Sequence, residues 1–196
     1  MAPYFETVKS FADIPISDGI DTKSFLEASD GLVMMFSLFG SQVFGFVQSD
    51  IRNNINGVRN RYQSSEECSR TLESLAENEA KEPRRDGTAC LVRLIRGLSL
   101  TCQALQNMQR DKSAELHVCF KKSYDSVLKH HHTFIIRSVV YVAIRAVPNR
   151  RDFYDKIAQG GSQEKLDEEL CRWLEALDVI VNRMSSFLEN KGFGRV

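Results

Sequence analysis

The sequence predicts an all-α protein of about eight helices stacked as a layered sandwich, and three observations predict it. Several long segments place apolar residues three and four positions apart, and no segment shows the sustained alternation that is typical of a strand. One helix in the middle of the chain carries apolar residues on two opposite sides, so we expect other helices to cover both sides. Only four prolines occur, and all lie outside the predicted helices, at Pro3, Pro15, Pro83 and Pro148.

The N-terminal part of the chain divides into a leader and three predicted helices. The leader, residues 1–20, contains Pro15 and is expected to pack on a single domain formed by residues 21–196. The small residues Gly40 and Gly45 lie near the end of the first predicted helix. The third helix is polar enough to be solvated. Apolar spacing predicts these helices over residues 22–47, 48–62 and 65–80.

The rest of the chain predicts four more helices. Pro148 ends the longest of them, because proline lacks the amide hydrogen that a helix interior needs. Asn149 and Ser162 stand directly before the last two helices, where a short polar side chain can accept a hydrogen bond from the first free amides. The four helices are predicted over residues 88–110, 113–147, 150–157 and 163–190.

The helix over residues 88–110 is the one that is apolar on two sides. Its main stripe consists of Leu91, Leu94, Ile95, Leu98, Cys102 and Leu105. Arg93 projects from the opposite side, which otherwise carries Ala89, Gly97, Leu100 and Ala104. If Arg93 is buried there, it requires an anionic partner, because an unpaired buried charge is very costly.

Composition excludes several classes of function. The 26 basic and 26 acidic residues give no net charge, which argues against nucleic-acid binding. Five scattered cysteines with no CxxC spacing predict free thiols in a reducing compartment, and no secretory signal or lipidation motif is recognised. The apolar runs are shorter than the roughly 20 residues that span a bilayer. We therefore expect a cytoplasmic protein whose membrane contact is peripheral.

Asp50 and Asn54 form the first candidate site, since residues four apart share one face of a helix. Their segment is rich in asparagine and contains Gly57, which disfavours a helix and suggests that the amides serve another purpose. An aspartate beside an asparagine can hold neighbouring hydroxyl groups of a sugar. The alternative is a polar face that only contacts water.

His132 is the second candidate, on a predicted helix face with Leu128, Ile135 and Val139. It is either a core histidine or a hydrogen-bonding group for a buried polar atom of an apolar ligand. The three consecutive histidines at 130–132 also suggest a metal, but adjacent helical residues point about 100° apart and cannot converge on one ion. We therefore expect no metal and no cofactor.

The predicted outward face of the same long helix combines aromatic and basic residues, which suits a membrane interface. Contact with another helix is the alternative. The residues on this face are His130, Phe134, Arg137, Tyr141 and Arg145.

Three phrases of this sequence resemble the glycolipid transfer protein family. GSQVFGFVQSDIRNNI resembles the headgroup helix of the family, RLIRGL resembles its central helix, and HTFIIRSVVYVAIRAVPNRRDF resembles the segment that follows the family histidine. The resemblance extends from about residue 22 to the end of the chain. It implies a two-layer all-α sandwich that encloses ceramide chains in an apolar tunnel and transfers the lipid without a cofactor.

The resemblance also implies roles for individual residues. Asp50 would bind the headgroup and the ceramide amide nitrogen, Asn54 the sugar, and His132 the ceramide carbonyl. Phe134 takes the place of a tryptophan at the membrane interface, with Tyr141 and Arg145 beside it. The tunnel residues are expected to be Phe36, Phe39, Val43, Leu128, Ile135, Val139 and Val140.

Two departures from the family pattern concern the headgroup. Arg93 stands where the family has a sugar-stacking tryptophan, and Gly57 stands where it has a lysine. An arginine at the first position resembles the branch that binds ceramide-1-phosphate, but Asn54 and Ala89 replace two further cations of that branch. Arg93 is therefore either a phosphate-binding residue or an ion-pair partner of Asp50.

The predicted function is non-enzymatic transfer of sphingolipids between membranes, with glycosphingolipids as the expected cargo. The alternatives are a phosphosphingolipid cargo, a sphingolipid sensor that acts through a protein partner, and an all-α hydrolase that uses His132. No hydrolase, kinase or dinucleotide-binding motif supports the last of these. We expect a monomer that contacts the membrane transiently.

Overall fold

The computed structural model describes residues 2–39 and 42–196, with side chains from residue 45 onward in the second segment. Within these residues the chain is helical, with no strand, which confirms the predicted all-α class. Three short 3-10 helices, η1 (Phe11–Asp13), η2 (Glu66–Cys68) and η3 (Lys129–His131), join the α-helices. The α-helices are α1 (Tyr4–Thr7), α2 (Thr22–Ser37), α3 (Gln42–Ser64), α4 (Leu72–Glu79), α5 (Asp86–Arg110), α6 (Leu116–Val127), α7 (Phe134–Arg145), α8 (Arg150–Ala158) and α9 (Gln163–Asn190).

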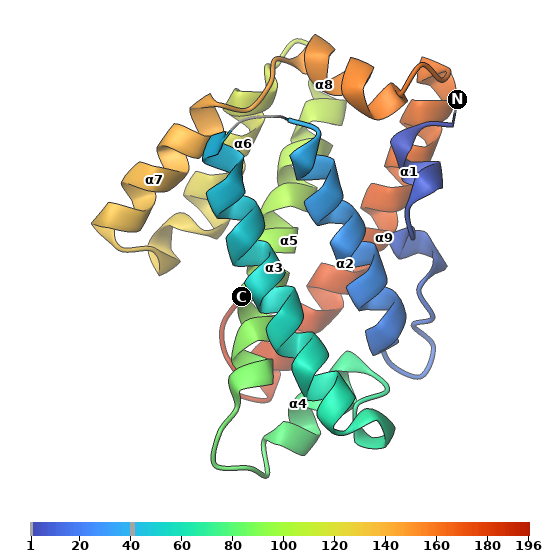
Figure 1. Ribbon diagram of the computed structural model, residues 1–196. Helices are drawn as coiled ribbons and strands as arrows, with labels where there is room; N and C mark the ends of the chain where they lie inside the picture. Colours follow the sequence, from blue (N-terminus) through green and yellow to red (C-terminus); the bar gives the residue numbers. More distant parts are fainter. Residues whose placement is uncertain (1, 40–41) are drawn as a thin grey trace.

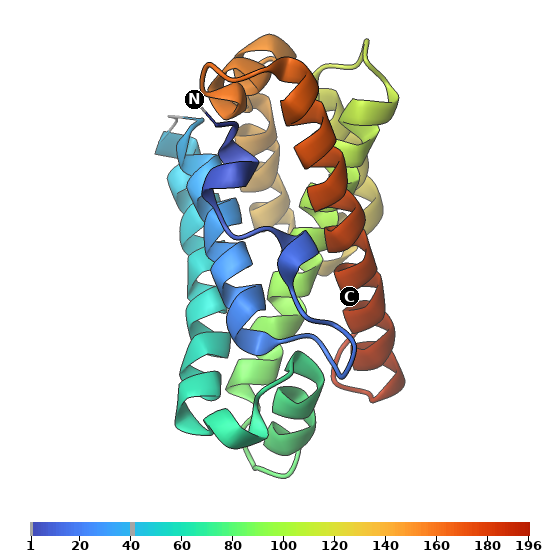
Figure 2. The same cartoon turned by 90° about the vertical axis from the view of Figure 1, so that its right-hand side faces the viewer.

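The helices form a layered sandwich around α5, which contacts α3, α6 and α9. In Figure 1, α2 and α3 run side by side in front of α5, and α7 lies at the edge of the molecule on the opposite side from α9. Figure 2 shows the layers edge-on, with α2 and α3 on one side and α9 on the other. The predicted stripe of α5 faces this core, since each of its six residues is at most 2% exposed.

The helices α3 and α5 approach each other closely at Gly57. A Cβ atom at this position would lie 2.8 Å from the Cβ of Cys90 and closer still to its Sγ. Real side chains do not pack at such distances, so only glycine fits here. The contact also explains one departure from the family pattern, because no lysine can stand at position 57 while Cys90 occupies this space.

Several predicted helix ends are confirmed. The side chain of Asn149 accepts a hydrogen bond from the amide of Asp152 before α8, and Ser162 accepts one from Lys165 before α9. The first two predicted helices have a different boundary. The helix α2 ends at Ser37 rather than near Val47, and α3 contains Gly45. Gly40 lies outside the described residues.

The prediction of a solvated helix over residues 65–80 is wrong. Its first part forms η2, and α4 then buries Leu72 and Leu75 completely. Thr71 and Ser74 hydrogen-bond reciprocally at the start of α4, which forms a capping box.

The prediction of one continuous helix over residues 113–147 is also wrong. The chain forms α6, then η3, and then α7, which begins after Thr133 in an extended conformation. The Thr133 side chain accepts a hydrogen bond from the amide of Ile136 and so caps α7. No glycine or proline marks this break in the sequence, and the break changes which residues of α7 face inward.

The N-terminal residues pack on the C-terminal helix. The rings of Phe5 and Phe11 contact Trp173 of α9, and the hydroxyl of Tyr4 donates a 2.6 Å hydrogen bond to the carbonyl of Gly31. The division into a leader and one domain stays a prediction. Among the described residues, no helix combines the length and apolar character needed to cross a membrane.

Replacing Gly57 with alanine should destabilise the protein by about 1–3 kcal/mol, because the added methyl group overpacks the contact with Cys90. Gly97→Ala is the matched control, since Gly97 lies in α5 with no atom within 4 Å of an added Cβ. It should be neutral or stabilising by up to about 1 kcal/mol, because alanine favours a helix. Urea denaturation of both variants checks this, and equal effects would contradict the close approach of α3 and α5.

Candidate functional site

A cavity of about 390 Å³ lies between α3, α5 and α7, with most of its lining apolar. Its polar residues come from three separate segments: Asp50 from α3, Arg93, Arg96 and Thr101 from α5, and His131 and His132 from the segment between α6 and α7. Asp50 and Arg93 are exposed, so this polar cluster lies where the cavity opens to solvent. The apolar lining consists of Phe36, Phe46, Val47, Ile51, Gly97, Leu100, Phe120, Leu128, Ile136, Val140, Ala143, Ile144 and Val147.

The second apolar side of α5 forms one wall of this cavity. Gly97 and Leu100 line it instead of packing against a covering helix, while Ala104, one turn further, is fully buried. The expectation that both sides are covered therefore holds only for part of the helix. The small side of α5 leaves space that a ligand can occupy.

Two arginines stand close together at the opening. Within the described residues, no ion pair joins Arg93 or Arg96 to a carboxylate, so the predicted alternative of an Arg93–Asp50 pair is wrong. The guanidinium of Arg96 donates to the main-chain carbonyl of Arg195, with Nε at 2.9 Å. Burial and the neighbouring charge of Arg93 lower the pKa of Arg96. Two guanidinium groups at one opening, neither in an ion pair with a described carboxylate, can bind an anionic ligand.

Asp50 and Asn54 share one face of α3, but they differ in exposure. Asn54 is only 5% exposed, and its side-chain amide donates a 2.9 Å hydrogen bond to the main-chain carbonyl of Asp50. Asp50 lines the cavity, whereas Asn54 does not. The asparagine thus supports the helix at the position where it presents the aspartate, and its predicted contact with a sugar stays a prediction.

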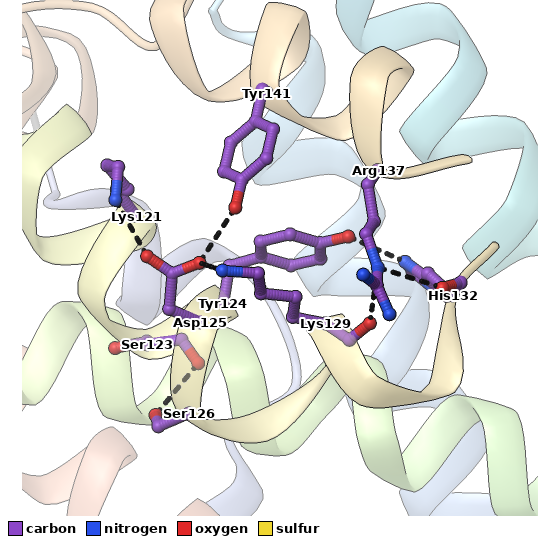
Figure 3. Close-up of polar contacts among 9 residues, drawn as sticks. All are labelled: Lys121, Ser123, Tyr124, Asp125, Ser126, Lys129, His132, Arg137 and Tyr141. Atoms are coloured by element: carbon purple, nitrogen blue, oxygen red, sulfur yellow. Dashed lines mark hydrogen bonds and ion pairs between the residues drawn. The ribbon is translucent and has the colours of Figure 1, made fainter. Parts of the chain in front are cut away.

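His132 lies in the turn before α7 rather than on a helix, which corrects the predicted helix stripe. Its backbone is extended, and its Nδ1 lies 3.1 Å from the hydroxyl of Tyr124, as Figure 3 shows. Burial lowers the pKa of the His132 imidazole, and the charges of Arg137 and Arg96 lower it further. The negative charge of the Asp50 carboxylate raises the pKa of this imidazole. The neutral ring can therefore offer Nε2 to a ligand in the cavity.

The residues of α7 that face inward are shifted by one position from the predicted ones. Ile136 and Val140 line the cavity, whereas Ile135 and Val139 do not, and Ile135 is 76% exposed. The prediction that Ile135 and Val139 line the tunnel is wrong, because it extrapolated the phase of one continuous helix across the break at residues 128–133. One residue of slip turns a helical side chain by about 100°.

The structure agrees with the prediction for only some of the other expected tunnel residues. Phe36, Leu128 and Val140 line the cavity. Phe39 does not, because its ring packs in the core against those of Phe36 and Phe153. The side chain of Val43 lies outside the described residues.

The outward face of α7 also differs from the expected stripe. Phe134 is 82% exposed and Arg145 is exposed, so both are available to a membrane surface. Tyr141 is half-buried, and its hydroxyl donates a 2.8 Å hydrogen bond to Asp125 of α6. The placement of Tyr141 on the exposed face is therefore wrong. The exposed apolar residues of α7 are Phe134, Ile135, Ile136, Val139 and Val142.

Sequence reasoning missed Arg96 and His131. Arg96 is three residues after Arg93, which is helical spacing, and this signal was present in the phrase RLIRGL. His131 gave no such signal, because its position depends on η3. In the described part of the chain, the buried Nε2 of His131 has no hydrogen-bond partner, and no group of three potential metal ligands gathers around it or elsewhere.

Comparison with known proteins identifies the family. A family model described as glycolipid transfer protein (GLTP) matches residues 20–159. The chain belongs to this family. A glycolipid transfer protein of Aureobasidium melanogenum is 37% identical over 190 residues, which cover 96% of this chain and 94% of the relative. Glycolipid transfer protein B of Xenopus laevis is 28% identical and covers 92% and 96% of the two chains.

Solved structures agree with this result. The crystal structure of HET-C2, described as a fungal glycolipid transfer protein, superposes with a TM-score of 0.90 at 38% identity and covers 95% of this chain and 96% of its own. A human ceramide-1-phosphate transfer protein in complex with 12:0 ceramide-1-phosphate has a TM-score of 0.86 at 18% identity, with 98% of both chains covered, and shares the fold. The GLTP fold is thereby established for this chain.

The stability of the protein should fall between pH 7.5 and pH 5.5. Burial lowers the pKa values of His131 and His132 below 6.5, so the unfolded chain binds more protons in this window. Hydrogen bonds from Lys121, Lys129 and Tyr141 hold the pKa of Asp125 below its usual value of 3.8. Protonation of this carboxylate therefore affects the stability of the protein only at a pH below this window.

Urea denaturation at both pH values checks this prediction. His132→Gln should reduce the loss of stability on acidification, because it removes one of the two histidines that resist protonation. The exposed His117 of α6 provides the control variant, His117→Gln, which should keep the full pH dependence. A parent protein that is equally stable at both pH values would contradict the burial of the two rings.

Proposed function

We propose that this protein transfers sphingolipids between membranes without chemical conversion of the lipid. The observation that carries the proposal is an apolar cavity whose opening combines Asp50, two arginines and His132, bordered by a helix with exposed apolar side chains. The cavity would take the alkyl chains, since burial contributes about 0.8 kcal/mol per CH₂ group. The family supports the proposal, because its named members are lipid transfer proteins.

The polar cluster would bind the headgroup and the ceramide amide. Asp50 can accept hydrogen bonds from a hydroxyl group and from the amide N–H, and Nε2–H of His132 can donate to the amide carbonyl. Selectivity follows from the penalty on polar groups that lose water without gaining a partner. A lipid that lacks the amide would leave His132 and Asp50 without this partner.

The headgroup itself has two candidates. The glycolipid transfer proteins among the relatives favour a neutral glycosphingolipid. Arg93 and Arg96 favour a second candidate, a sphingolipid with a phosphate in its headgroup, because no carboxylate neutralises either guanidinium in the described residues. Asp50 is compatible with both, since a phosphate-bearing headgroup can carry hydroxyl groups as well.

The outer face of α7 would dock on the membrane during lipid uptake. Among the described side chains, Phe134 and Ile135 are the most exposed large apolar ones, and Arg145 can meet lipid phosphates at the same surface. We accordingly propose a cytoplasmic protein that associates with membranes transiently.

Asp50→Val should abolish transfer and leave the fold intact, because the side chain is exposed and only its main-chain carbonyl supports Asn54. The measurement is transfer of labelled glucosylceramide between donor and acceptor vesicles, together with thermal unfolding. Asp18→Val, at an exposed aspartate of the leader, is the control and should transfer lipid as the parent does. Full transfer by Asp50→Val would exclude Asp50 from the site.

Arg93→Leu should reduce transfer of ceramide-1-phosphate about tenfold or more, because a hydrogen bond to a charged group contributes roughly 1.5–3 kcal/mol. Transfer of glucosylceramide should change little. The same vesicle assay with both lipids measures the ratio, and Arg110→Leu, at the exposed end of α5, is the control. If the parent and Arg93→Leu show the same ratio, Arg93 does not recognise phosphate.

A further inference from the structure

The turn that carries His132 has no residue that enforces its shape. Residues 128–133 include neither glycine nor proline, and the backbone passes from η3 to an extended conformation at His132. Such a turn depends on the hydrogen bonds that its carbonyl groups receive, because residues after a helix leave carbonyls without helical partners. The source of these hydrogen bonds therefore determines where the imidazole lies.

The amide of His132 donates one of them, to the carbonyl of Lys129 at 3.3 Å, and Arg137, in the first turn of α7, adds two shorter ones. Its Nε donates to the carbonyl of Lys129 and to the carbonyl of His132, each at 2.9 Å. Figure 3 shows the Arg137 side chain reaching back from α7 onto the turn. One charged N–H group thus joins both ends of the segment from 129 to 132, and a charge-assisted hydrogen bond is stronger than a neutral one.

The His132 ring is held from a second direction. Tyr124 of α6 is fully buried, and burial raises its pKa, so its hydroxyl keeps the proton that it can donate to Nδ1 of His132. When Nδ1 accepts, the ring proton of the neutral imidazole is on Nε2, the nitrogen left for the cavity. With Tyr124 as the donor, the proton of the neutral ring is on Nε2, while Arg137 holds the main chain from which the ring projects.

A further contact fixes the helix that carries Arg137. The Tyr141 hydroxyl, one turn along α7, donates to Asp125 of α6, and Lys121 and Lys129 pair with the same carboxylate at 2.7 and 3.0 Å. The network therefore ties α7 to α6 on the side of the turn (Figure 3). These contacts hold α7, which carries Arg137, against α6, which precedes the turn.

We propose that Arg137 is a positioning residue, which fixes the His132 turn through two main-chain carbonyls so that Nε2–H of His132 points at the amide carbonyl of the lipid. The inference rests on the proposed function for the lipid contact itself. Arg137 is not a cavity-lining residue, so it would act only through His132. No ligand needs to touch it.

Charge and geometry make different predictions for this role. The ammonium of lysine lies beyond the position of the arginine Nε and cannot bridge the same two carbonyls, although it keeps the positive charge. Both Arg137→Lys and Arg137→Met should therefore reduce transfer of glucosylceramide about tenfold. A purely electrostatic role would predict loss in Arg137→Met alone.

The deciding readout is the tautomer of His132 in the lipid-free full chain, measured by long-range ¹H–¹⁵N NMR with the His132→Gln variant as assignment control. The parent should show one tautomer with the proton on Nε2. Arg137→Lys and Arg137→Met should show mixed tautomers, because the ring leaves its position opposite Tyr124. Lys122→Met, at an exposed position of α6, should match the parent in both assays.

Each outcome decides the proposal. If Arg137→Lys keeps both the parent transfer rate and the single tautomer, Arg137 does not position the turn, and the same result in Arg137→Met would exclude any role. Should Arg137→Met fail to fold, Arg137→Lys alone gives the answer. If the parent transfers no sphingolipid at all, the proposed function fails, while the tautomer spectra still decide whether Arg137 positions His132.

Discussion

The cavity depends on one packing constraint, which is that α5 is apolar on two sides but only one side is fully covered. The main stripe of α5 is buried in the core, whereas Gly97 and Leu100 on the other side face open space. The helix α7 stands opposite with only Ala143 and Ile144 buried. An unfilled apolar cavity is costly because its lining forfeits contacts and, if hydrated, orders water against apolar surface. Alkyl chains in this space would recover those contacts, so the incomplete packing favours lipid binding.

In the proposed function, the charges at the opening would determine headgroup selectivity, and the apolar cavity would supply most of the affinity. Arg93 and Arg96 repel each other, and the lowered pKa of Arg96 shows this effect together with burial. A bound anion would relieve the repulsion, while a neutral headgroup would not. The close contact of Gly57 with Cys90 also leaves no room for a lysine at position 57 of α3. The two arginines of α5 are therefore the cations that a headgroup would meet at this opening.

The sequence was sufficient for the fold class, for the stripe of α5 and for the helices capped by Asn149 and Ser162, since each rests on local periodicity or local hydrogen bonding. It was insufficient where tertiary contacts determine the end of a helix or the direction of a side chain. The break before α7 carries no glycine or proline, so a continuous helix was predicted, and Ile135 and Val139 were turned inward by mistake. The family resemblance assigned Phe39 to the tunnel, and its apolar character could not show that it is a core residue rather than part of the cavity wall. Arg96 could have been found from its spacing to Arg93.

The break between α6 and α7 explains why the site needs Arg137. In a continuous helix, the carbonyl groups of Lys129 and His132 would bond to helical amides, and no side chain would be required to hold them. The interruption moves His132 off the helix and lets its ring meet Tyr124 on one side and the cavity on the other. It also leaves the Lys129 carbonyl with only the 3.3 Å bond from the His132 amide, and Arg137 binds both carbonyls. A weakly buried helix can thus present a histidine in one orientation, provided that polar contacts replace the packing that α7 lacks.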